Sequence, residues 1–352
     1  MKIRMSTLKF SSLVIFLFSF LISCTKTGSQ APVVNLAIWG NYLSKEAENR
    51  FKEQTGIRLN IMNYSSNEEL LAKIQSGASG IDVAVPSDYM VDVMTKLKLL
   101  QPLELEKISA AKTLNKNLMH QPFDPNNQFS LPYSWAMAGI AVNRELFQDP
   151  INSWHDFFEN PKLRGKISVL DDVRETTGAV LLMQGHSVNT TNEAELKAAR
   201  EALIKIKSAV KMFSSDTVDL LKNKEVVAAH SYSPDALQAN EKSGGKIEFI
   251  VPKEGATRAI DNLVIVKGST HLEASHKLIN FLLQKENNAE FVRTIRGGPV
   301  VEDVKPMLPP DLQQSKTLFP PPEIFSKLER IQDLGDQNRR YEEIWTAVKS
   351  AQ

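Results

Sequence analysis

The sequence contains a single cysteine, Cys24, so no disulfide can form within the 352-residue chain. The fold must therefore be held together by its hydrophobic core. Long blocks of like charge and low-complexity repeats are also missing, which indicates a compact globular body. With 42 basic and 41 acidic residues, the formal net charge is only +1, and no basic run indicates a nucleic-acid-binding surface.

Motifs that mark familiar enzymes are missing as well. No G-x-x-x-x-G-K-[ST] loop is present, because RGKIS lacks the upstream glycine, and no G-x-S-x-G elbow occurs. The histidines show no metal-ligand spacing; they are His120, His155, His186, His230, His271 and His276. We therefore expect no metal, no cofactor and no catalytic residues, and an enzyme ranks behind two kinds of binding protein as an interpretation.

The first 23 residues have the features of a lipoprotein signal peptide. Lys2, Arg4 and Lys9 precede the apolar run SSLVIFLFSFLIS, which is too short and too one-sided for a stable membrane span. The run ends in LISC, which fits a bacterial lipobox, so we expect Cys24 to be lipidated; an uncleaved anchor or a free cysteine is the alternative. Residues 24–32 would then be a tether, and the mature chain would carry 39 basic and 41 acidic residues.

From residue 33 onwards, short apolar runs alternate with amphipathic segments. VVNLAI, IRLNIM and IDVAV predict strands, and the segments between them, capped by Ser44 and by Ser66, predict helices. The same alternation starts again after residue 139 with GIAVN and GKISVL. This pattern predicts an α/β fold with two lobes, parallel-type sheets flanked by helices, and ligands bound beyond the carboxyl ends of the strands.

The order of several segments resembles the polyamine-binding proteins of spermidine/putrescine ABC transporters, which are periplasmic solute-binding proteins. The segments that carry the resemblance are IWGNY, SNEELLAKIQSG, DVAVPSDYMVDVM, QPFDPNNQFSLPYSW, SVLDDVRET, VPKEG, DNLVI and SHKLINFLLQKENNAE. The family implies a type II periplasmic-binding-protein fold with the ligand cleft between two lobes. Residues 33–137 plus 260–305 would form lobe 1, and residues 138–259 plus 306–352 would form lobe 2.

The resemblance also implies a set of ligand-binding residues. By their positions in the matching segments, these are Trp39, Tyr42, Ser87, Tyr89, Asp172, Glu175 and Asp261, with Tyr232 at the place of a family tryptophan. Such side chains suit a polyamine, because ammonium groups need carboxylates in a closed cleft and favour aromatic rings.

Five of these residues also have a purely structural interpretation. Asp172 and Glu175 have capping-box spacing, and a helix N-terminus would keep both carboxylates ionised, so they can cap a helix and bind an ammonium group. Trp39 and Tyr89 can be plain core aromatics, and Asp261 can be an acid at the start of a strand.

The sequence departs from the family at several ring positions. Ala259 stands where the family has a tryptophan, Gly297 stands where it has a tyrosine, and a family glutamine falls on Ile331 or Gln332. Arg258 and Arg296 lie beside these gaps. If either side chain points into the cleft, it would oppose a polycation and could instead meet a carboxylate on the ligand. A ligand with one amine and one anionic group is therefore an alternative to spermidine or putrescine.

The function implied is non-enzymatic capture of a small cationic solute and its delivery to the transmembrane subunits of an ABC permease. The protein is expected to be a monomer in the periplasm, attached to the membrane only through the lipid. A sensor lipoprotein with the same cleft is the second interpretation, because both roles need only closure around a ligand.

Overall fold

The computed structural model describes residues 32–40, 42–77 and 80–351. The expected signal peptide, Cys24 and all but the last residue of the expected tether lie outside the described residues. Within these ranges, no helix is both long enough and apolar enough to cross a membrane.

Helices and strands alternate along the chain, as the sequence predicts. The strands are β1 (Val33–Trp39), β2 (Arg58–Tyr64), β3 (Val83–Ala84), β4 (Leu100–Gln101), β5 (Ser130–Asn143), β6 (Ile167–Val169), β7 (Val210–Phe213), β8 (Ala228–Tyr232), β9 (Ile247–Ile250), β10 (Ala256–Val266) and β11 (Leu328–Arg330). The α-helices are α1 (Lys45–Thr55), α2 (Asn67–Gln75), α3 (Asp88–Lys96), α4 (Trp154–Phe158), α5 (Val173–Met183), α6 (Glu193–Lys207), α7 (Thr217–Lys222), α8 (Ser233–Lys242), α9 (Leu272–Leu282), α10 (Lys285–Ile295), α11 (Pro310–Gln313), α12 (Pro322–Phe325) and α13 (Asn338–Ser350).

Short polar residues start the first two helices where the sequence predicts. The hydroxyl of Ser44 accepts a hydrogen bond from the amide of Ala47 at 3.0 Å, and Ser66 does the same for Glu69 at 3.1 Å. The capping box at α2 differs in one detail, because the carboxylate of Glu69 bonds to the amide of Ser65 rather than Ser66.

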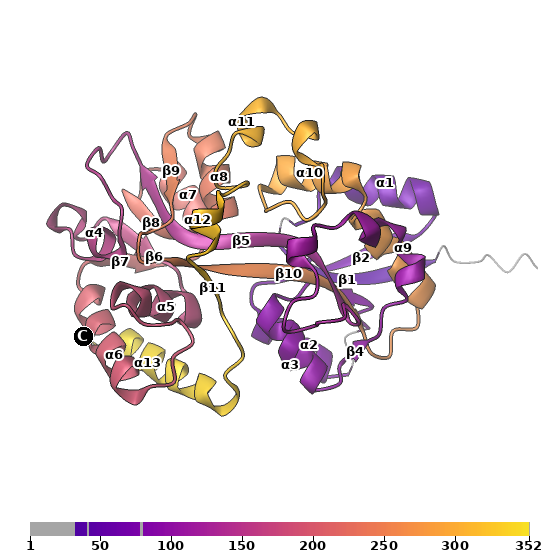
Figure 1. Ribbon diagram of the computed structural model, residues 1–352, viewed down its shortest axis with the longest axis horizontal. Coiled ribbons are helices and arrows are strands. Elements are labelled where there is room, and N and C mark those ends of the chain that lie inside the picture. The colour runs from indigo at the N-terminus through magenta and orange to yellow at the C-terminus, as the bar shows by residue number, and fades with distance from the viewer. Residues whose placement is uncertain (1–31, 41, 78–79, 352) are drawn as a thin grey trace, which may run out of the picture. The chain divides into compact units, whose positions relative to one another are not determined.

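The strands form one mixed sheet with the order β2-β1-β3-β10-β5-β8-β6-β7. Pairing is parallel among β1, β2 and β3 and among β6, β7 and β8, which gives each of the two lobes its parallel part. The long strands β5 and β10 are antiparallel and join these parts (Figure 1). The expected boundaries near residues 137 and 259 fall inside this pair, where Met137 lies opposite Arg258.

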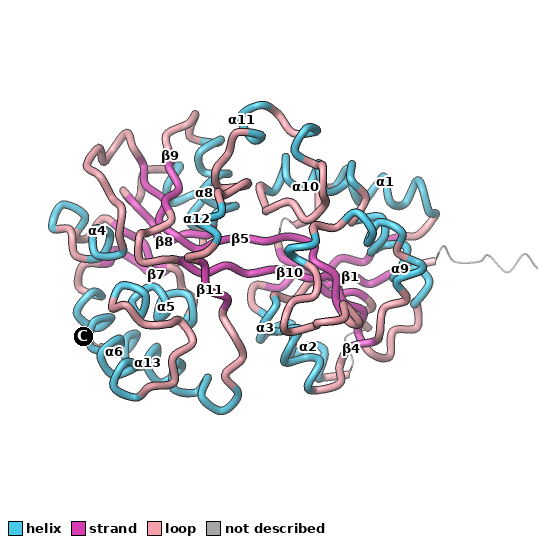
Figure 2. Tube along the Cα trace, in the orientation of Figure 1, coloured by secondary structure: helices cyan, strands magenta, loops and turns pink. Residues whose placement is uncertain are grey.

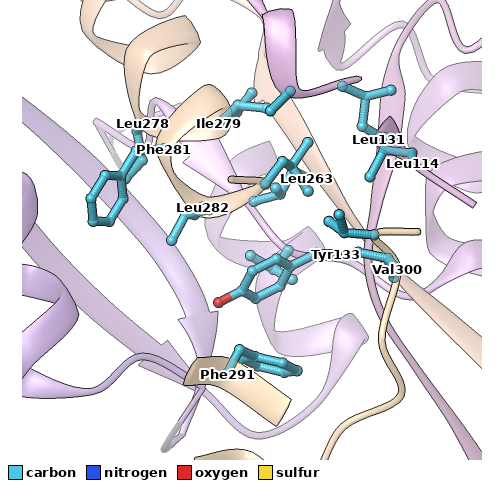
Figure 3. Close-up of a cluster of buried hydrophobic side chains, with 14 of the residues drawn as sticks. Leu114, Leu131, Tyr133, Leu263, Leu278, Ile279, Phe281, Leu282, Phe291 and Val300 are labelled. Atoms are coloured by element: carbon cyan, nitrogen blue, oxygen red, sulfur yellow. The ribbon is translucent and has the colours of Figure 1, made fainter. Parts of the chain in front are cut away.

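Helices surround the strands (Figure 2), and the largest hydrophobic clusters lie between them. One cluster gathers side chains from β5, β10, α9 and α10, including Tyr133 and Phe291 (Figure 3). The hydroxyl of Tyr133 donates a hydrogen bond to the backbone carbonyl of Tyr42 at 3.1 Å. The core thereby fixes the turn that follows β1, where predicted site residues lie.

Candidate ligand-binding site

Asp261 lies on β10 and is held by two hydroxyl groups from lobe 1. Ser87, which precedes α3, donates to one carboxylate oxygen at 2.7 Å, and Tyr42, after β1, donates to the other at 3.0 Å. The residue is 7% exposed. Burial raises the pKa of Asp261 to about 6, against the lowering effect of the two hydrogen bonds. Three predicted site residues are thus brought together around one desolvated carboxylate.

Asp172 and Glu175 lie at the start of α5. Asp172 is the N-cap, and its Oδ1 accepts hydrogen bonds from the amides of Arg174 and Glu175, both at 2.9 Å. Glu175 is buried in the first turn and accepts a hydrogen bond from the hydroxyl of Thr257 on β10. The capping interpretation is confirmed for Asp172, whereas the side chain of Glu175 reaches across to β10.

The pKa of both acids in this pair is raised above its ordinary value. Burial is the main cause for each, and the charge of Asp172 adds to the shift at Glu175. The two amide hydrogen bonds from the N-terminus of α5 lower the pKa of Asp172, but burial outweighs them. A cation placed between the two acids would favour their ionised form.

Of three further predicted aromatic residues, Tyr232 and Tyr89 contact acids, and Trp39 contacts a neighbouring strand end. The hydroxyl of Tyr232 lies 3.4 Å from Oδ2 of Asp172, and the hydroxyl of Tyr89 donates to Glu68 at 2.9 Å. The indole nitrogen of Trp39 donates to the carbonyl of Val85 at 2.9 Å, which ties the end of β1 to the end of β3. All three rings are half-buried rather than sealed in the core.

Ala259 lies between the two groups of acids. Side chains alternate along a strand, so Thr257, Ala259 and Asp261 point to one face of β10. Thr257 holds Glu175 at one end of this face, and Asp261 stands about 13 Å away at a rise of about 3.3 Å per residue. The partner of Ala259 on β5 is Ala136, so both strands carry a small side chain at this place.

The absence of a side chain at Gly297 has a steric cause. A Cβ there would lie 2.4 Å from the hydroxyl oxygen of Ser134 and 2.5 Å from the ring of Phe291. Phe291 itself lies edge-on to Tyr42, with ring centroids 5.5 Å apart. A tyrosine at position 297 therefore does not fit this backbone, and Phe291 supplies the ring next to Tyr42 instead.

The two arginines that the sequence singles out lie in different surroundings. Arg296 ends α10 with a φ of 66°, and its guanidinium pairs with Glu241 on α8 at 2.6 Å. Arg258 lies on β10 next to Arg330 of β11, and its guanidinium stacks over Phe325 at 5.3 Å.

Two acids near the site were not predicted as ligand-binding residues. Asp235 lies in the first turn of α8 directly after β8, and burial raises its pKa to about 7. Burial also raises the pKa of Tyr42 and Tyr232 well above the ordinary value, and the nearby charge of Asp235 contributes to both shifts. The sequence signal that could have identified Asp235 is its position just beyond the carboxyl end of a strand. Glu68, the partner of Tyr89, lies at the start of α2 and carried no comparable signal.

Arg174 does not neutralise the acids through direct contact. Its guanidinium stacks over the ring of Tyr341 at 4.3 Å and donates to Asn338 at 3.0 Å and Asn189 at 3.1 Å. It acts as a structural tie between α5 and α13, and its charge only partly offsets that of Glu175.

Comparisons with known proteins identify the family of the chain. Residues 46–320 match the family described as bacterial extracellular solute-binding protein, and the chain belongs to that family. A putrescine/cadaverine-binding protein of Pseudomonas aeruginosa is 31% identical, over 95% of this chain and 98% of its own length.

Two solved structures extend the likeness to the fold. One, a putative spermidine/putrescine ABC transporter protein from Listeria monocytogenes, is 31% identical with a TM-score of 0.85, over 91% of this chain and 99% of that one. The other, a lipoprotein of Treponema pallidum, is 28% identical with a TM-score of 0.81, over 90% and 99% of the two chains. The fold is that of the two-lobed periplasmic binding proteins, as the sequence predicts.

Proposed function

We propose that this protein is the substrate-binding lipoprotein of an ABC importer, that it captures a polyamine of the putrescine/spermidine type between its lobes, and that it delivers this ligand to the permease. The observation that carries the proposal is a set of three carboxylates, half-buried at Asp172 and buried at Glu175 and Asp261, that no cation of the protein neutralises by direct contact within the part of the chain that the structure describes.

Buried carboxylates of this kind call for a cation. An isolated ionised carboxylate in a low-dielectric place is very costly, so it either binds a proton or gains a positive partner. The groups that act most strongly on Asp261, apart from its burial, are the neutral hydroxyls of Ser87 and Tyr42. A ligand with two or three ammonium groups supplies the missing charges.

The arrangement also suits the shape of a polyamine. The acids stand at the two ends of one face of β10, with Ala259 between them, so ammonium groups at the ligand's ends would meet carboxylates and its methylene chain would lie over an apolar residue. Tyr42, Tyr89, Tyr232 and Trp39 add rings whose faces attract cations. All of these contacts leave the covalent bonds of the ligand unchanged, which supports binding rather than catalysis.

Contacts between the expected lobes support closure around the ligand. Lys96 at the end of α3 pairs with Asp333 before α13 at 3.0 Å, and Arg296 pairs with Glu241 at 2.6 Å. Each pair joins residues that the sequence assigns to different lobes. Hinge closure is the motion by which periplasmic binding proteins enclose their ligands.

Membrane attachment through Cys24 completes the proposal. The lipobox sequence supports it, and so does the likeness to a lipoprotein of Treponema pallidum. Cys24→Ser in the full-length chain should move the protein from the membrane fraction to the soluble fraction after cell lysis. An unchanged membrane fraction in the variant would refute the lipid anchor without affecting the ligand proposal.

A thermal-shift panel tests the ligand. The chain from residue 25 onwards should gain stability with putrescine, cadaverine and spermidine, because a ligand that binds only the folded state raises the melting temperature. 1,4-Butanediol is the matched control, since it has the length of putrescine without its charges. An equal response to the diol, or no response to any of the amines, would refute the proposed function.

A further inference from the structure

Arg258 and Arg330 form a pair of half-buried cations on neighbouring strands. They are direct partners in the parallel pairing of β10 with β11, so their side chains leave the sheet side by side. In each guanidinium, Nη1 is buried and has no hydrogen-bond partner. Buried donors are normally satisfied, so two orphaned donors next to each other indicate a missing acceptor.

Aromatic rings hold both guanidinium groups in place. The centre of the Arg258 guanidinium lies 5.3 Å from the ring of Phe325, and that of Arg330 lies 5.5 Å from the ring of Phe123. Stacking occupies the flat faces of a guanidinium and leaves its N–H edge available. This edge suits a carboxylate, which accepts two parallel hydrogen bonds.

Asp88 is the third member of this group, and one of its two carboxylate oxygens also lacks a partner. Its side chain is 1% exposed, Oδ1 accepts the amide of Tyr89 at 2.9 Å, and Oδ2 has no hydrogen-bond partner. The charges of Arg330 and Arg258 both act on it, and yet neither arginine forms an ion pair with it among the described residues. Burial raises the pKa of Asp88 to about 7, so it can hold a proton.

We propose that Arg258, Arg330 and Asp88 form a subsite for a carboxylate. The oxygens of the incoming group would accept from the two free Nη1 donors, and protonated Asp88 would donate from Oδ2. Nη1 of Arg258, Nη1 of Arg330 and Oδ2 of Asp88 would then all have hydrogen-bond partners. The assignment rests on the proposed function, because it takes the amine end of the ligand to be held by Asp172, Glu175 and Asp261.

The carboxylate has two possible sources. It can belong to the ligand, which would then be an amine that carries a carboxylate, or it can be a separate small anion that binds together with a polyamine. Ornithine and putrescine separate these sources, since ornithine is putrescine with one added carboxylate. Lysine and cadaverine form a second pair with the same difference.

Calorimetric titrations of the chain from residue 25 onwards test the subsite. We expect ornithine to bind the wild-type protein. Arg258→Met should weaken ornithine binding at least 10-fold and strengthen putrescine binding, because it removes a cation near the polyamine. If the source is a separate anion, putrescine should bind the wild type more tightly in acetate than in chloride, and Arg258→Met should abolish the difference. Arg330→Met should repeat either pattern, while Arg339→Met, a change at an exposed arginine on α13, should leave all titrations as in the wild type.

The outcomes separate this inference from the proposed function. If putrescine binds but ornithine and acetate have no effect, the subsite is refuted and the polyamine proposal stands. If ornithine binds and no polyamine does, the polyamine proposal fails and the subsite stands. If Arg258→Met weakens putrescine and ornithine equally, Arg258 supports the fold alone, and the subsite is refuted.

Discussion

The hydroxyl of Thr257 donates a hydrogen bond to the carboxylate of Glu175, although the two residues are 82 positions apart in the sequence. This contact joins a strand that crosses between the lobes to the first turn of α5. It places Glu175 at one end of the β10 face whose other end is Asp261. Thr257 therefore positions Glu175, the acid that we propose binds an ammonium group.

Thr257→Val tests this positioning. The isosteric change removes the donor, and we expect polyamine affinity to fall by about 0.5–1.5 kcal/mol, the net worth of a hydrogen bond. Titration calorimetry measures the loss. Thr176→Val is the matched control, because the hydroxyl of Thr176 donates to the backbone carbonyl of Leu170 rather than to a carboxylate. Equal losses in the two variants would mean that Thr257 acts only through general stability.

Ala259→Trp tests the missing ring on the β10 face. A ring beside the methylene chain and the ammonium groups should strengthen polyamine binding by about 0.5–2 kcal/mol. Ala259→Leu adds apolar bulk without a π face and should gain much less. If the leucine variant gains as much as the tryptophan variant, cation attraction to the ring is not the cause.

Polyamine binding should release protons near neutral pH. Burial raises the pKa of Asp261 to about 6, and the pKa of Glu175 is raised as well, so the free site is partly protonated. An ammonium group lowers these pKa values, and the protons leave on binding. Titrations at pH 6.5 in two buffers of different ionisation enthalpy should therefore give different heats. Identical heats in both buffers would show that no proton moves.

The stability of the ligand-free protein should fall as pH rises from about 6.5 to 8.5. An acid whose pKa is higher in the folded state stabilises the fold below its unfolded pKa, and this contribution is lost as pH rises through the folded value. The pKa of Asp88 and that of Asp235 are raised by burial from 3.8 to about 7, so the loss begins near the ordinary value and its last part falls at the lower end of this window. His230 acts in the opposite sense only at lower pH, because burial lowers its pKa to about 3.

Thermal unfolding measured with and without putrescine tests this pH dependence. The melting temperature without ligand should drop across the window, and saturating putrescine should flatten the curve. Asp235→Asn should reduce the drop, whereas Asp149→Asn, at an exposed acid paired with Lys162, should leave the slope of the curve as in wild type. A ligand-free melting temperature that rises across the window would contradict the burial of uncompensated acids.

Local patterns predicted much of the fold and part of the site. Ser44 and Asp172 cap helices because a short polar side chain just before a helix can accept hydrogen bonds from the free amides of its first turn. Contacts between distant segments were beyond such patterns: nothing near Glu175 in the sequence indicates Thr257, and nothing near Arg258 indicates Arg330. Gly297 shows the same limit, since its reason lies in the ring of Phe291 and the hydroxyl of Ser134. Asp235 was missed because its neighbours Tyr42 and Tyr232, rather than its own segment, place it near the candidate site.

The most direct test of the central claim is a calorimetric titration of the chain from residue 25 onwards with putrescine and with spermidine, repeated on Asp261→Asn and Asp172→Asn. The account predicts micromolar or tighter binding of at least one polyamine to the wild type and a loss of at least 10-fold in each variant, because each change removes a charge that an ammonium group needs. Wild-type affinity retained in both variants, or no polyamine binding to the wild type, would contradict it.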